Sequence, residues 1–260
     1  MIPKIIHYSW FSGEPYPAEL KACMDTWRRV LPDYEFVLWD AKRLAECGNA
    51  FANEAVSVGK WAFAADFVRL YAVYHYGGIW LDTDVEMFKS FDPFLSDGMF
   101  IGREYYVYRD KQRTVRTMVT SHCFGAEPRH PFLRECLEYY EHRHFIRSHN
   151  EKLDETLRYD MTIIPALQAA LMKNYGFDDR NANNRPQLLS NGIHVYPYQY
   201  FDQPGYTSMR DVVCIHRVAQ SWRPGTKGET AKSVTDPKRK TMGYYKMKAQ
   251  EKLADFILKL

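Results

Sequence analysis

One short stretch, residues 76–84 (Tyr-Gly-Gly-Ile-Trp-Leu-Asp-Thr-Asp), places two acids directly after an apolar strand that follows a Gly-Gly pair. Side chains at positions i and i+2 of a strand point the same way, so Asp82 and Asp84 should face one spot at the strand's carboxyl end. Open α/β sheets bind ligands at that edge. Two carboxylates there suit Mg²⁺ or Mn²⁺ held together with the phosphates of a substrate. The pattern therefore indicates a site that handles a diphosphate.

The hydrophobic periodicity around this stretch predicts an α/β fold. Residues 2–10 and 35–39 read as strands on either side of a helix at 17–31, which is a βαβ unit and implies a parallel sheet. A strong helix at 60–76 leads into the acid-bearing strand at 79–81. The remaining expected elements are strands at 100–102, 121–126, 194–197 and 212–215, and helices at 131–149, 162–175 and 241–260.

Length and charge divide the chain in two. At 260 residues it can form one sizeable α/β domain, which we place at residues 1–225, with an extension at 226–260. Residues 227–260 hold nine Lys and Arg against four Asp and Glu, a net +5, which leaves −2 for the rest of the +3 chain. A basic tail on a slightly acidic body is a candidate for binding an anionic surface.

The cysteines and the first residues of the chain indicate in which cellular compartment the protein is expected. The five cysteines are scattered, odd in number and without zinc-type spacing, which is typical of a reducing cytoplasm. We see no signal peptide in the first residues and no apolar run as long as a membrane span. These features predict a cytoplasmic protein.

Two further groups should lie near the acids. Asp66 and Arg69 are spaced i, i+3 on the helix before the strand, so they share one face. In a functional interpretation, Asp66 accepts bonds from a ribose or base while Arg69 contacts phosphate or supports the acids. A plain helical salt bridge is the alternative. His216 follows the apolar strand at 212–215 and could complete a divalent site or bind phosphate, with Trp222 closing over a ligand.

With these residues in place, the chain resembles a known family. Residues 61–70 (Trp-Ala-Phe-Ala-Ala-Asp-Phe-Val-Arg-Leu) and 76–84 are similar to the DXD-containing sugar-binding region of glycosyltransferase family 32, which includes capsular polysaccharide and Och1-like enzymes. They are more distantly similar to the catalytic domain of the large clostridial glucosylating toxins. Residues 2–10 resemble the family's first strand. Residues 214–222 resemble its closing block, although residues 217–220 (Arg-Val-Ala-Gln) depart from the expected His-Trp-Ala-Gly.

This resemblance implies a GT-A fold, a Rossmann-like and mostly parallel central sheet flanked by helices, and a hexosyltransferase that retains anomeric configuration. It implies Mn²⁺ or Mg²⁺ and a nucleotide-sugar donor, most readily a UDP-hexose. The residue roles that it implies are metal binding by Asp82, Asp84 and His216, and donor binding by Tyr8, Ser9, Trp10, Asp66, Arg69, Asp82, Ser221 and Trp222. In that assignment Trp10 with residues 8–9 lines the base pocket, and residues 221–222 belong to a lid over the diphosphate.

The nucleophile is a separate question. Asp160 aligns with a family loop beside the donor sugar and is a candidate catalytic residue. The alternative is that Asp160 caps the helix expected to begin near Thr162. A retaining enzyme can also let the acceptor attack on the face of the leaving group, so the two interpretations stay open.

The acceptor and the tail complete the predictions. The resemblance implies a glycan or lipid-linked acceptor in bacterial surface polysaccharide synthesis, with a GDP-mannose-dependent mannosyltransferase as an alternative. Basic and aromatic residues alternate through 238–260, which suits a helix on an anionic inner leaflet and a peripheral place on the cell membrane. The same helix could instead dock on the core.

Other classes of protein remain as alternatives. A diphosphate hydrolase or nucleotidyltransferase could use the same acids, but a nucleotidyltransferase should show a Gly-rich phosphate loop after the first strand, where residues 11–15 read Phe-Ser-Gly-Glu-Pro. A sugar-binding module would need the aromatic residues but not the paired acids. A nucleic-acid binder is a poor fit because the basic residues gather in one tail.

Overall fold

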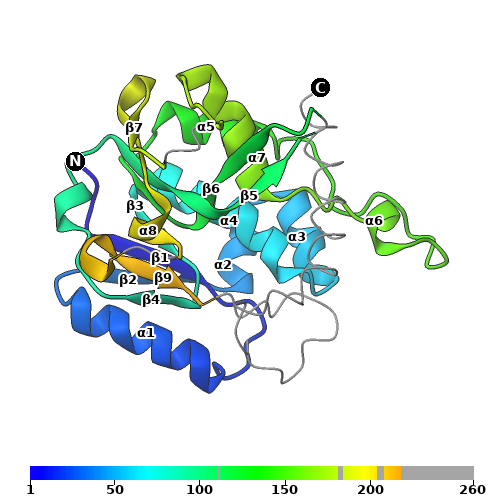
Figure 1. Ribbon diagram of the computed structural model, residues 1–260. Coiled ribbons are helices and arrows are strands. Elements are labelled where there is room, and N and C mark those ends of the chain that lie inside the picture. Colours follow the sequence, from blue (N-terminus) through cyan, green and yellow to red (C-terminus); the bar gives the residue numbers. More distant parts are fainter. Residues whose placement is uncertain (111, 181–183, 204–207, 218–260) are drawn as a thin grey trace, which may run out of the picture.

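The computed structural model describes residues 1–110, 112–180, 184–203 and 208–217. A seven-stranded sheet forms its centre, in the order β2-β1-β3-β6-β5-β8-β7, with helices packed around it (Figure 1). Its strands are β1 (Ile5–Ser9), β2 (Glu35–Trp39), β3 (Gly78–Leu81), β5 (Met99–Arg109), β6 (Val115–Ala126), β7 (Gln187–Leu188) and β8 (Ile193–Tyr196). A separate two-stranded sheet pairs β4 (Val85–Met87) with β9 (Cys214–His216).

The central sheet is mostly parallel. β1 pairs in parallel with β2 and β3, and β5 pairs in parallel with β8, while β6 and β7 run against their neighbours. Because β1, β2 and β3 point the same way, their carboxyl ends share one edge. The predicted α/β class with a mostly parallel sheet flanked by helices is therefore confirmed, as is the parallel pairing of the first βαβ unit.

Both faces of the sheet are covered, as the alternation along β3 shows. Trp80 packs into one apolar cluster, with α4 (Trp61–Tyr76), α5 (Pro131–Glu138) and α7 (Ile164–Met172). Its neighbours Ile79 and Leu81 pack into the other cluster, beside α1 (Ala18–Val30). A four-residue strand buried on both sides explains why the sequence reads as a continuous apolar run there.

The two-stranded sheet is fastened to the body by α1. The indole Nε1 of Trp27 donates to the carbonyl of Val85 at 2.6 Å, and the hydroxyl of Thr26 accepts from the amide of Met87 at 2.8 Å. Both bonds run from α1 to β4, which continues the chain after the acid pair. These two bonds fix the segment that follows the acid pair to α1.

Several predicted elements need correction. The strands expected at 100–102 and 121–126 are the ends of the longer β5 and β6, and the strand expected at 212–215 belongs to the small sheet. The helix expected at 131–149 ends at Glu138, and His142 adopts a left-handed φ of 60° that no α-helix allows. The chain then forms a projecting segment that carries α6 (Glu155–Arg158) (Figure 1).

Sequence patterns also missed the short helices α2 (Ala41–Glu46) and α3 (Ala50–Ser57) before α4, and α8 (Tyr198–Phe201). Short 3-10 turns at Asp92–Phe94, Lys173–Tyr175, Ser190–Gly192 and Met209–Asp211 complete the described elements. The extension predicted at 226–260, with its loop and helix, lies outside the described residues, and the division of the chain at residue 225 stays a prediction.

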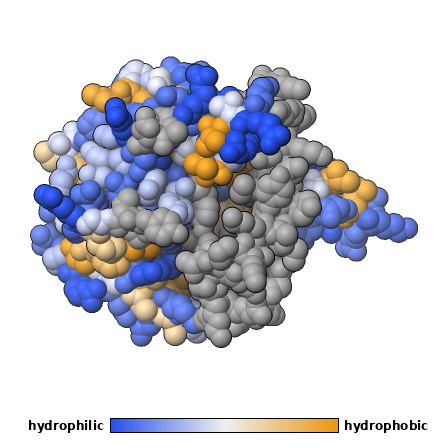
Figure 2. Space-filling model, in the orientation of Figure 1, coloured by the Kyte–Doolittle hydropathy of each residue, from blue (hydrophilic) through white to orange (hydrophobic). Residues whose placement is uncertain are grey.

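Among the described residues in Figure 2, most of the surface is hydrophilic and the apolar side chains lie in separate patches. One patch lies on the projecting segment, where Leu153 is 37% and Leu157 is 60% exposed. Within the described part of the chain, no helix combines the length and apolar character needed to cross a membrane.

Candidate active site

The acid pair lies in a tight turn between β3 and β4. The amide of Asp82 donates to the carbonyl of His122 on β6 at 2.9 Å, and the amide of Val85 donates back to the carbonyl of Asp82 at 3.0 Å. The strand therefore ends at Leu81, and the turn brings the two carboxylates together. This corrects our expectation that strand alternation would align them, although the predicted convergence stands.

His216 joins the acids because β9 lies antiparallel to β4, with His216 opposite Val85. Its Nε2 is 3.3 Å from the Oδ2 of Asp84, and one ligand atom from each of Asp82, Asp84 and His216 lies within 4.8 Å of the others. The three side chains are 27%, 14% and 22% exposed, so the group is open to solvent on one side. The structure thus assembles the three residues that the sequence proposed as metal ligands.

The charge state of His216 reflects these acids. Burial favours the neutral ring, but the ion pair and hydrogen bond with Asp84, helped by Asp202 and Asp82, outweigh it and raise the pKa of His216 to about 9. Without a cation, the protonated ring balances the carboxylates. A divalent ion bound by these groups would replace that proton, because it needs the neutral imidazole as a ligand. Two carboxylates and one imidazole with an open side fit Mn²⁺ or Mg²⁺.

Arg69 ties the predicted helix pair to this group. Its Nη2 lies 3.1 Å from Asp66 and 3.5 Å from Asp82, and its Nη1 donates to the carbonyl of Ser121 at 2.6 Å. The helical salt bridge therefore exists, and the same guanidinium also supports an acid of the site. Both sequence interpretations of Arg69 describe part of what it does.

Asp66 is buried, unlike the carboxylate of an ordinary surface salt bridge. Burial raises its pKa to about 7, against the opposing effect of Arg69, and Asp82 adds to the rise. Its Oδ2 accepts from the amide of Ile164 at 3.3 Å, so it sits at the first turn of α7. The carboxylate is 11% exposed. Donor contact by Asp66 stays a prediction.

The segment predicted for the base pocket follows β1 at the same edge of the sheet. Tyr8 is buried against Trp27, with ring centroids 5.6 Å apart. The ring of Trp10 packs on Tyr16 at 4.9 Å, and its Nε1 donates to the carbonyl of Glu14 at 2.7 Å. Because β1 neighbours β3, Ser9 at the end of β1 and Trp10 after it lie on the side of the acid turn. Base binding by this segment stays a prediction.

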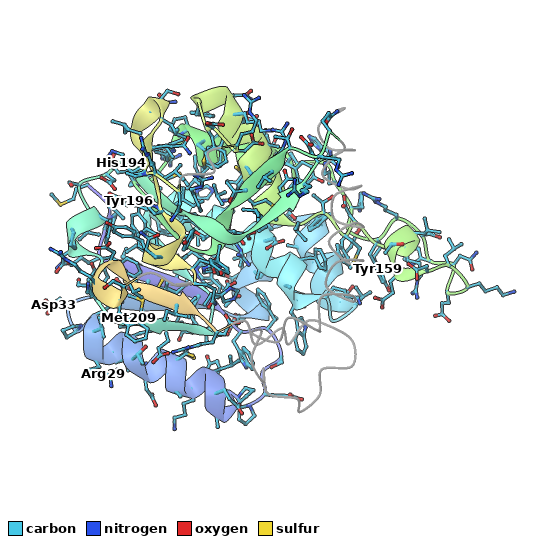
Figure 3. All side chains as sticks on the ribbon, viewed as in Figure 1. Arg29, Asp33, Tyr159, His194, Tyr196 and Met209 are labelled. Carbon is cyan, nitrogen blue, oxygen red and sulfur yellow. The ribbon has the colours of Figure 1, made fainter. Side chains whose placement is uncertain are left out.

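Asp160 has a defined structural role. Its Oδ1 accepts from the amide and hydroxyl of Thr162, at 3.1 and 2.7 Å, and lies 3.0 Å from Arg147. The helix starts later than expected, with Ile163 at its N-cap and no side-chain cap there, so the capping alternative is wrong. Asp160 instead closes the loop that follows Tyr159, which Figure 3 labels. Its catalytic role remains a prediction, and Ser221 and Trp222 lie outside the described residues.

Sequence reasoning missed two buried residues beside His216. The ring of His122 stacks on that of His216, with centroids 4.0 Å apart, and Asp202 lies 3.9 Å from His122. The carboxyl of Glu104 lies near them, and burial with the charge of Asp202 raises its pKa to about 8. No local spacing could identify these residues, because they meet only through the pairing of β6 with β3 and the approach of residues 198–202 to β5 and β9.

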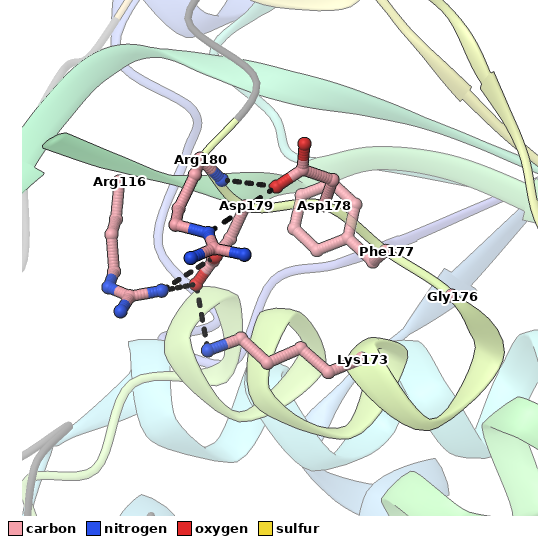
Figure 4. A pocket seen from close by; sticks show the side chains of 7 residues that line it. All are labelled: Arg116, Lys173, Gly176, Phe177, Asp178, Asp179 and Arg180. Carbon is pink, nitrogen blue, oxygen red and sulfur yellow. Dashed lines mark hydrogen bonds and ion pairs between the residues drawn. The ribbon is translucent and has the colours of Figure 1, made fainter. Parts of the chain in front are cut away.

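A separate shallow pocket lies over the start of β6 (Figure 4). Asp179 pairs there with both Arg116 at 2.8 Å and Lys173 at 2.7 Å. These charges satisfy one another and read as a structural network. The acid turn, rather than this pocket, carries the chemistry of a diphosphate site.

Comparisons with known proteins agree with the acid turn as the site. Residues 17–101 match the family described as glycosyltransferase sugar-binding region containing DXD motif. This range includes α4 and the acid turn but neither residues 2–10 nor 214–222.

Among curated proteins, the chain is 29% identical over 160 residues to inositol phosphoceramide mannosyltransferase 1 of Schizosaccharomyces pombe, covering 56% of this chain and 46% of that protein. It is 31% identical over 137 residues to the uncharacterized glycosyltransferase L373 of Acanthamoeba polyphaga mimivirus, covering 50% and 52%. The chain thus spans about half the length of these relatives.

Among solved structures, the PaToxG glycosyltransferase has a TM-score of 0.45 and 17% identity, covering 66% of this chain and 69% of that one. The resemblance to glycosyltransferase family 32 predicted from the sequence is confirmed, and the chain carries the DXD-containing sugar-binding region of glycosyltransferases.

Proposed function

We propose that this protein is a glycosyltransferase that moves a hexose from a nucleotide sugar to an acceptor. One observation carries the proposal: Asp82, Asp84 and His216 converge at the carboxyl edge of the sheet. The two acids, with Arg69 beside Asp82, lie inside the region shared with glycosyltransferases. The match is to glycosyltransferases, which favours sugar transfer over diphosphate hydrolysis or simple sugar binding.

Asp82, Asp84 and His216 are the residues that would hold Mn²⁺ or Mg²⁺. When bound, such an ion supplies a Lewis acid that stabilises the negative charge on a departing diphosphate, an effect of several kcal/mol. Arg69 holds the carboxylate of Asp82 in place through its 3.5 Å contact. Asp66, buried behind Arg69, fixes that guanidinium in turn through its 3.1 Å contact.

The donor is a nucleotide sugar, and the relatives help to identify which sugar it carries. The relative from Schizosaccharomyces pombe is named as a mannosyltransferase, which favours a mannosyl donor such as GDP-mannose. A UDP-hexose, expected from the family resemblance, stands beside it as the second candidate. Retention of the anomeric configuration belongs to the same proposal.

The acceptor is a glycan or a lipid-linked sugar. The name of the relative from Schizosaccharomyces pombe gives inositol phosphoceramide as the acceptor of that protein, which supports a lipid acceptor. A role in bacterial surface polysaccharide synthesis gains no support from these relatives. A cytoplasmic site of action, with residues 238–260 at an anionic membrane surface, remains part of the proposal.

Turnover with a donor panel tests this function. Purified full-length protein is incubated with GDP-mannose, UDP-glucose or UDP-galactose, with and without Mn²⁺, and release of the nucleoside diphosphate is measured. We expect one donor to be consumed only with Mn²⁺, faster when an acceptor glycolipid is added. Sugar released at the same rate without acceptor would indicate a hydrolase.

The matched variants are Asp84→Asn at the site and Asp33→Asn, which changes an exposed acid in the turn between α1 and β2 that Figure 3 labels. Asp84→Asn should lose turnover by about a hundredfold or more, because it removes a proposed metal ligand. Asp33→Asn should match the unaltered protein. Equal turnover in both variants contradicts the proposed role of the acid turn.

A further inference from the structure

A second group of metal-binding side chains adjoins the first and shares one residue with it. One ligand atom from each of His122, Asp202 and His216 lies within 4.8 Å of the others. His122 comes from β6, His216 from β9, and Asp202 directly follows α8. His122 and Asp202 are each 5% exposed, so this second group is more buried than the acid turn.

The carboxylate of Asp202 is held with one oxygen directed at the histidines. Its Oδ2 accepts from the amide of Tyr105 at 2.7 Å, which leaves Oδ1 at 3.9 Å from the Nε2 of His122. The backbone of Asp202 is fixed as well, because its carbonyl accepts from the amide of His216 at 3.3 Å. Such anchoring by neighbouring groups is typical of residues that hold a metal ion.

The two histidine rings are held side by side. They stack with centroids 4.0 Å apart and planes 23° from parallel. The Nε2 of His122 lies 2.8 Å from the carbonyl oxygen of Phe201, which can only accept, so this nitrogen carries the proton and donates it. Zn²⁺ bound at Nε2 would displace that proton and replace the bond to Phe201. A cation that enters beside His216, whose side chain is 22% exposed, would meet imidazole nitrogen and carboxylate oxygen atoms together.

The two groups differ in the ion that they suit. Asp82 and Asp84 supply two oxygens for every nitrogen, which favours Mn²⁺ or Mg²⁺. His122 and Asp202 with His216 supply two imidazoles and one carboxylate, a donor set typical of Zn²⁺. Because both sets need His216, only one of them can be complete at a time.

We propose that His122, Asp202 and His216 form a Zn²⁺ site that competes with the Mn²⁺ site for His216. Zinc–nitrogen bonds near 2 Å place tetrahedral ligand atoms about 3.3 Å apart, so the ligand atoms, which lie within 4.8 Å of one another, must approach by at most about 1.5 Å. Rotation of His216 away from Asp84 supplies this movement. Zn²⁺ is thereby an inhibitory ion for this protein. The competition rests on the proposed function, whereas the site itself does not.

Metal titrations of the full-length protein test the proposal. Zn²⁺ affinity is measured by competition with a fluorescent zinc indicator, and Mn²⁺ occupancy by the electron paramagnetic resonance signal of the free ion. We expect Zn²⁺ to release bound Mn²⁺ one for one. His122→Phe, which keeps a flat ring in the stack, should weaken Zn²⁺ binding by about a hundredfold, and Asp202→Asn should do the same.

Two controls separate the sites. Asp82→Asn should abolish Mn²⁺ binding and leave Zn²⁺ affinity nearly unchanged. His130→Phe changes another buried histidine, whose Nε2 also lies 3.0 Å from a backbone carbonyl, and should alter neither metal. Circular dichroism confirms that each variant is folded.

Loss of Zn²⁺ affinity in Asp82→Asn but not in His122→Phe or Asp202→Asn would overturn the proposal, because Zn²⁺ would then occupy the acid turn. Simultaneous binding of Zn²⁺ and Mn²⁺ would overturn the competition. If the unaltered protein binds Zn²⁺ through His122 but binds no Mn²⁺, the proposed function fails while the zinc site stands.

Discussion

At the scale of single residues, the orientation of Asp82 is set before any ligand binds. The indole Nε1 of Trp80 donates to its Oδ1 at 2.7 Å, and the guanidinium of Arg69 approaches the same oxygen at 3.5 Å. The indole is fully buried, so rotation of the carboxylate would leave its N–H unpaired. The side chain of Asp82 is therefore held in one orientation beside the proposed metal site.

Removing the indole bond should weaken metal binding. Trp80→Phe keeps an aromatic ring in the core but deletes the donor to Asp82, and we expect Mn²⁺ affinity to fall about tenfold. Calorimetric titration with Mn²⁺ measures the effect. The control is Trp39→Phe, another fully buried indole, which donates instead to His7 at 3.2 Å. An equal loss in both variants would show a general effect on the fold.

The residue scale also shows what the sequence could predict. Asp82, Asp84 and His216 were identifiable because each follows an apolar run that ends at a polar position. His122 and Asp202 were not, since their role depends on which strands pair. For Asp160 the sequence predicted either catalysis or helix capping. In the structure its carboxylate instead contacts Thr162 and Arg147.

At the scale of elements, the join between α4 and β3 depends on two glycines in positive φ. Gly77 has φ 65° and Gly78 has φ 98°. A Cβ on Gly78 would lie 2.6 Å from the carbonyl oxygen of Ile5 on β1, so the close approach of the two strands requires glycine. This contact brings β3 into the sheet beside β1.

Substitution of this glycine should be costly. Gly78→Ala combines an unfavourable φ with a backbone clash, and we expect it to destabilise the protein by about 3 kcal/mol or more. Gly59→Ala is the matched control, because Gly59 has φ 70° but nothing within 4 Å of its Cβ position, and should cost about 1 to 2 kcal/mol. Urea denaturation measures both. Equal costs would show that the approach to Ile5 carries no strain.

His7 links three elements and predicts a pH dependence. On β1, its Nδ1 accepts from Trp39 on β2, and its Nε2 lies 2.9 Å from the carbonyl of Gly77 after α4. Burial lowers its pKa from 6.5 to about 4, although the bond to Gly77 opposes the shift. The unfolded chain therefore takes up the proton first as the pH falls. His7 should cost the folded state about 3 kcal/mol of stability between pH 6.5 and pH 4.

The comparison of His7→Gln with the unaltered protein isolates this effect. The free energy of unfolding of the variant should fall less steeply from pH 6.5 to pH 4, while His149→Gln, at an exposed position, should keep the original slope. Parallel curves for all three proteins would exclude a neutral, buried His7 as the cause.

Elements were predictable where periodicity was strong and local. The helix at 60–76 and the strands at 35–39 and 79–81 agree with α4, β2 and β3 to within a residue. The helix expected at 131–149 is wrong beyond Glu138, where α5 ends. Four residues later His142 has a left-handed φ, and an isolated bridge then pairs Ile146 with Tyr159. Tertiary pairing, which no local pattern records, decided that segment.

At the scale of the whole molecule, the proposed ion would join the two sheets. Asp82 directly follows β3 of the large sheet, whereas His216 ends β9 of the small one, which α1 and α8 hold in place. The sequence predicted the α/β class and this edge of the sheet. It did not predict a separate β4–β9 sheet, because the partner strands lie far apart in the chain.

A bridging ion should stabilise the whole fold. At Mn²⁺ a hundredfold above its dissociation constant, we expect about 2.7 kcal/mol of added stability and a rise of several degrees in the melting temperature. Asp84→Asn should remove the rise, and Asp33→Asn should keep it. Thermal unfolding with and without Mn²⁺ measures this effect. A rise that persists in Asp84→Asn would place the ion elsewhere.

The most direct test of the central claim is a calorimetric titration of the full-length protein with the donor identified by turnover, with and without Mn²⁺. We predict that the nucleotide sugar binds with Mn²⁺ present, binds at least about tenfold more weakly without it, and shows no Mn²⁺ dependence in Asp84→Asn. Equal donor affinity with and without Mn²⁺, or an unchanged Mn²⁺ dependence in Asp84→Asn, would contradict a metal-assisted diphosphate site at Asp82, Asp84 and His216.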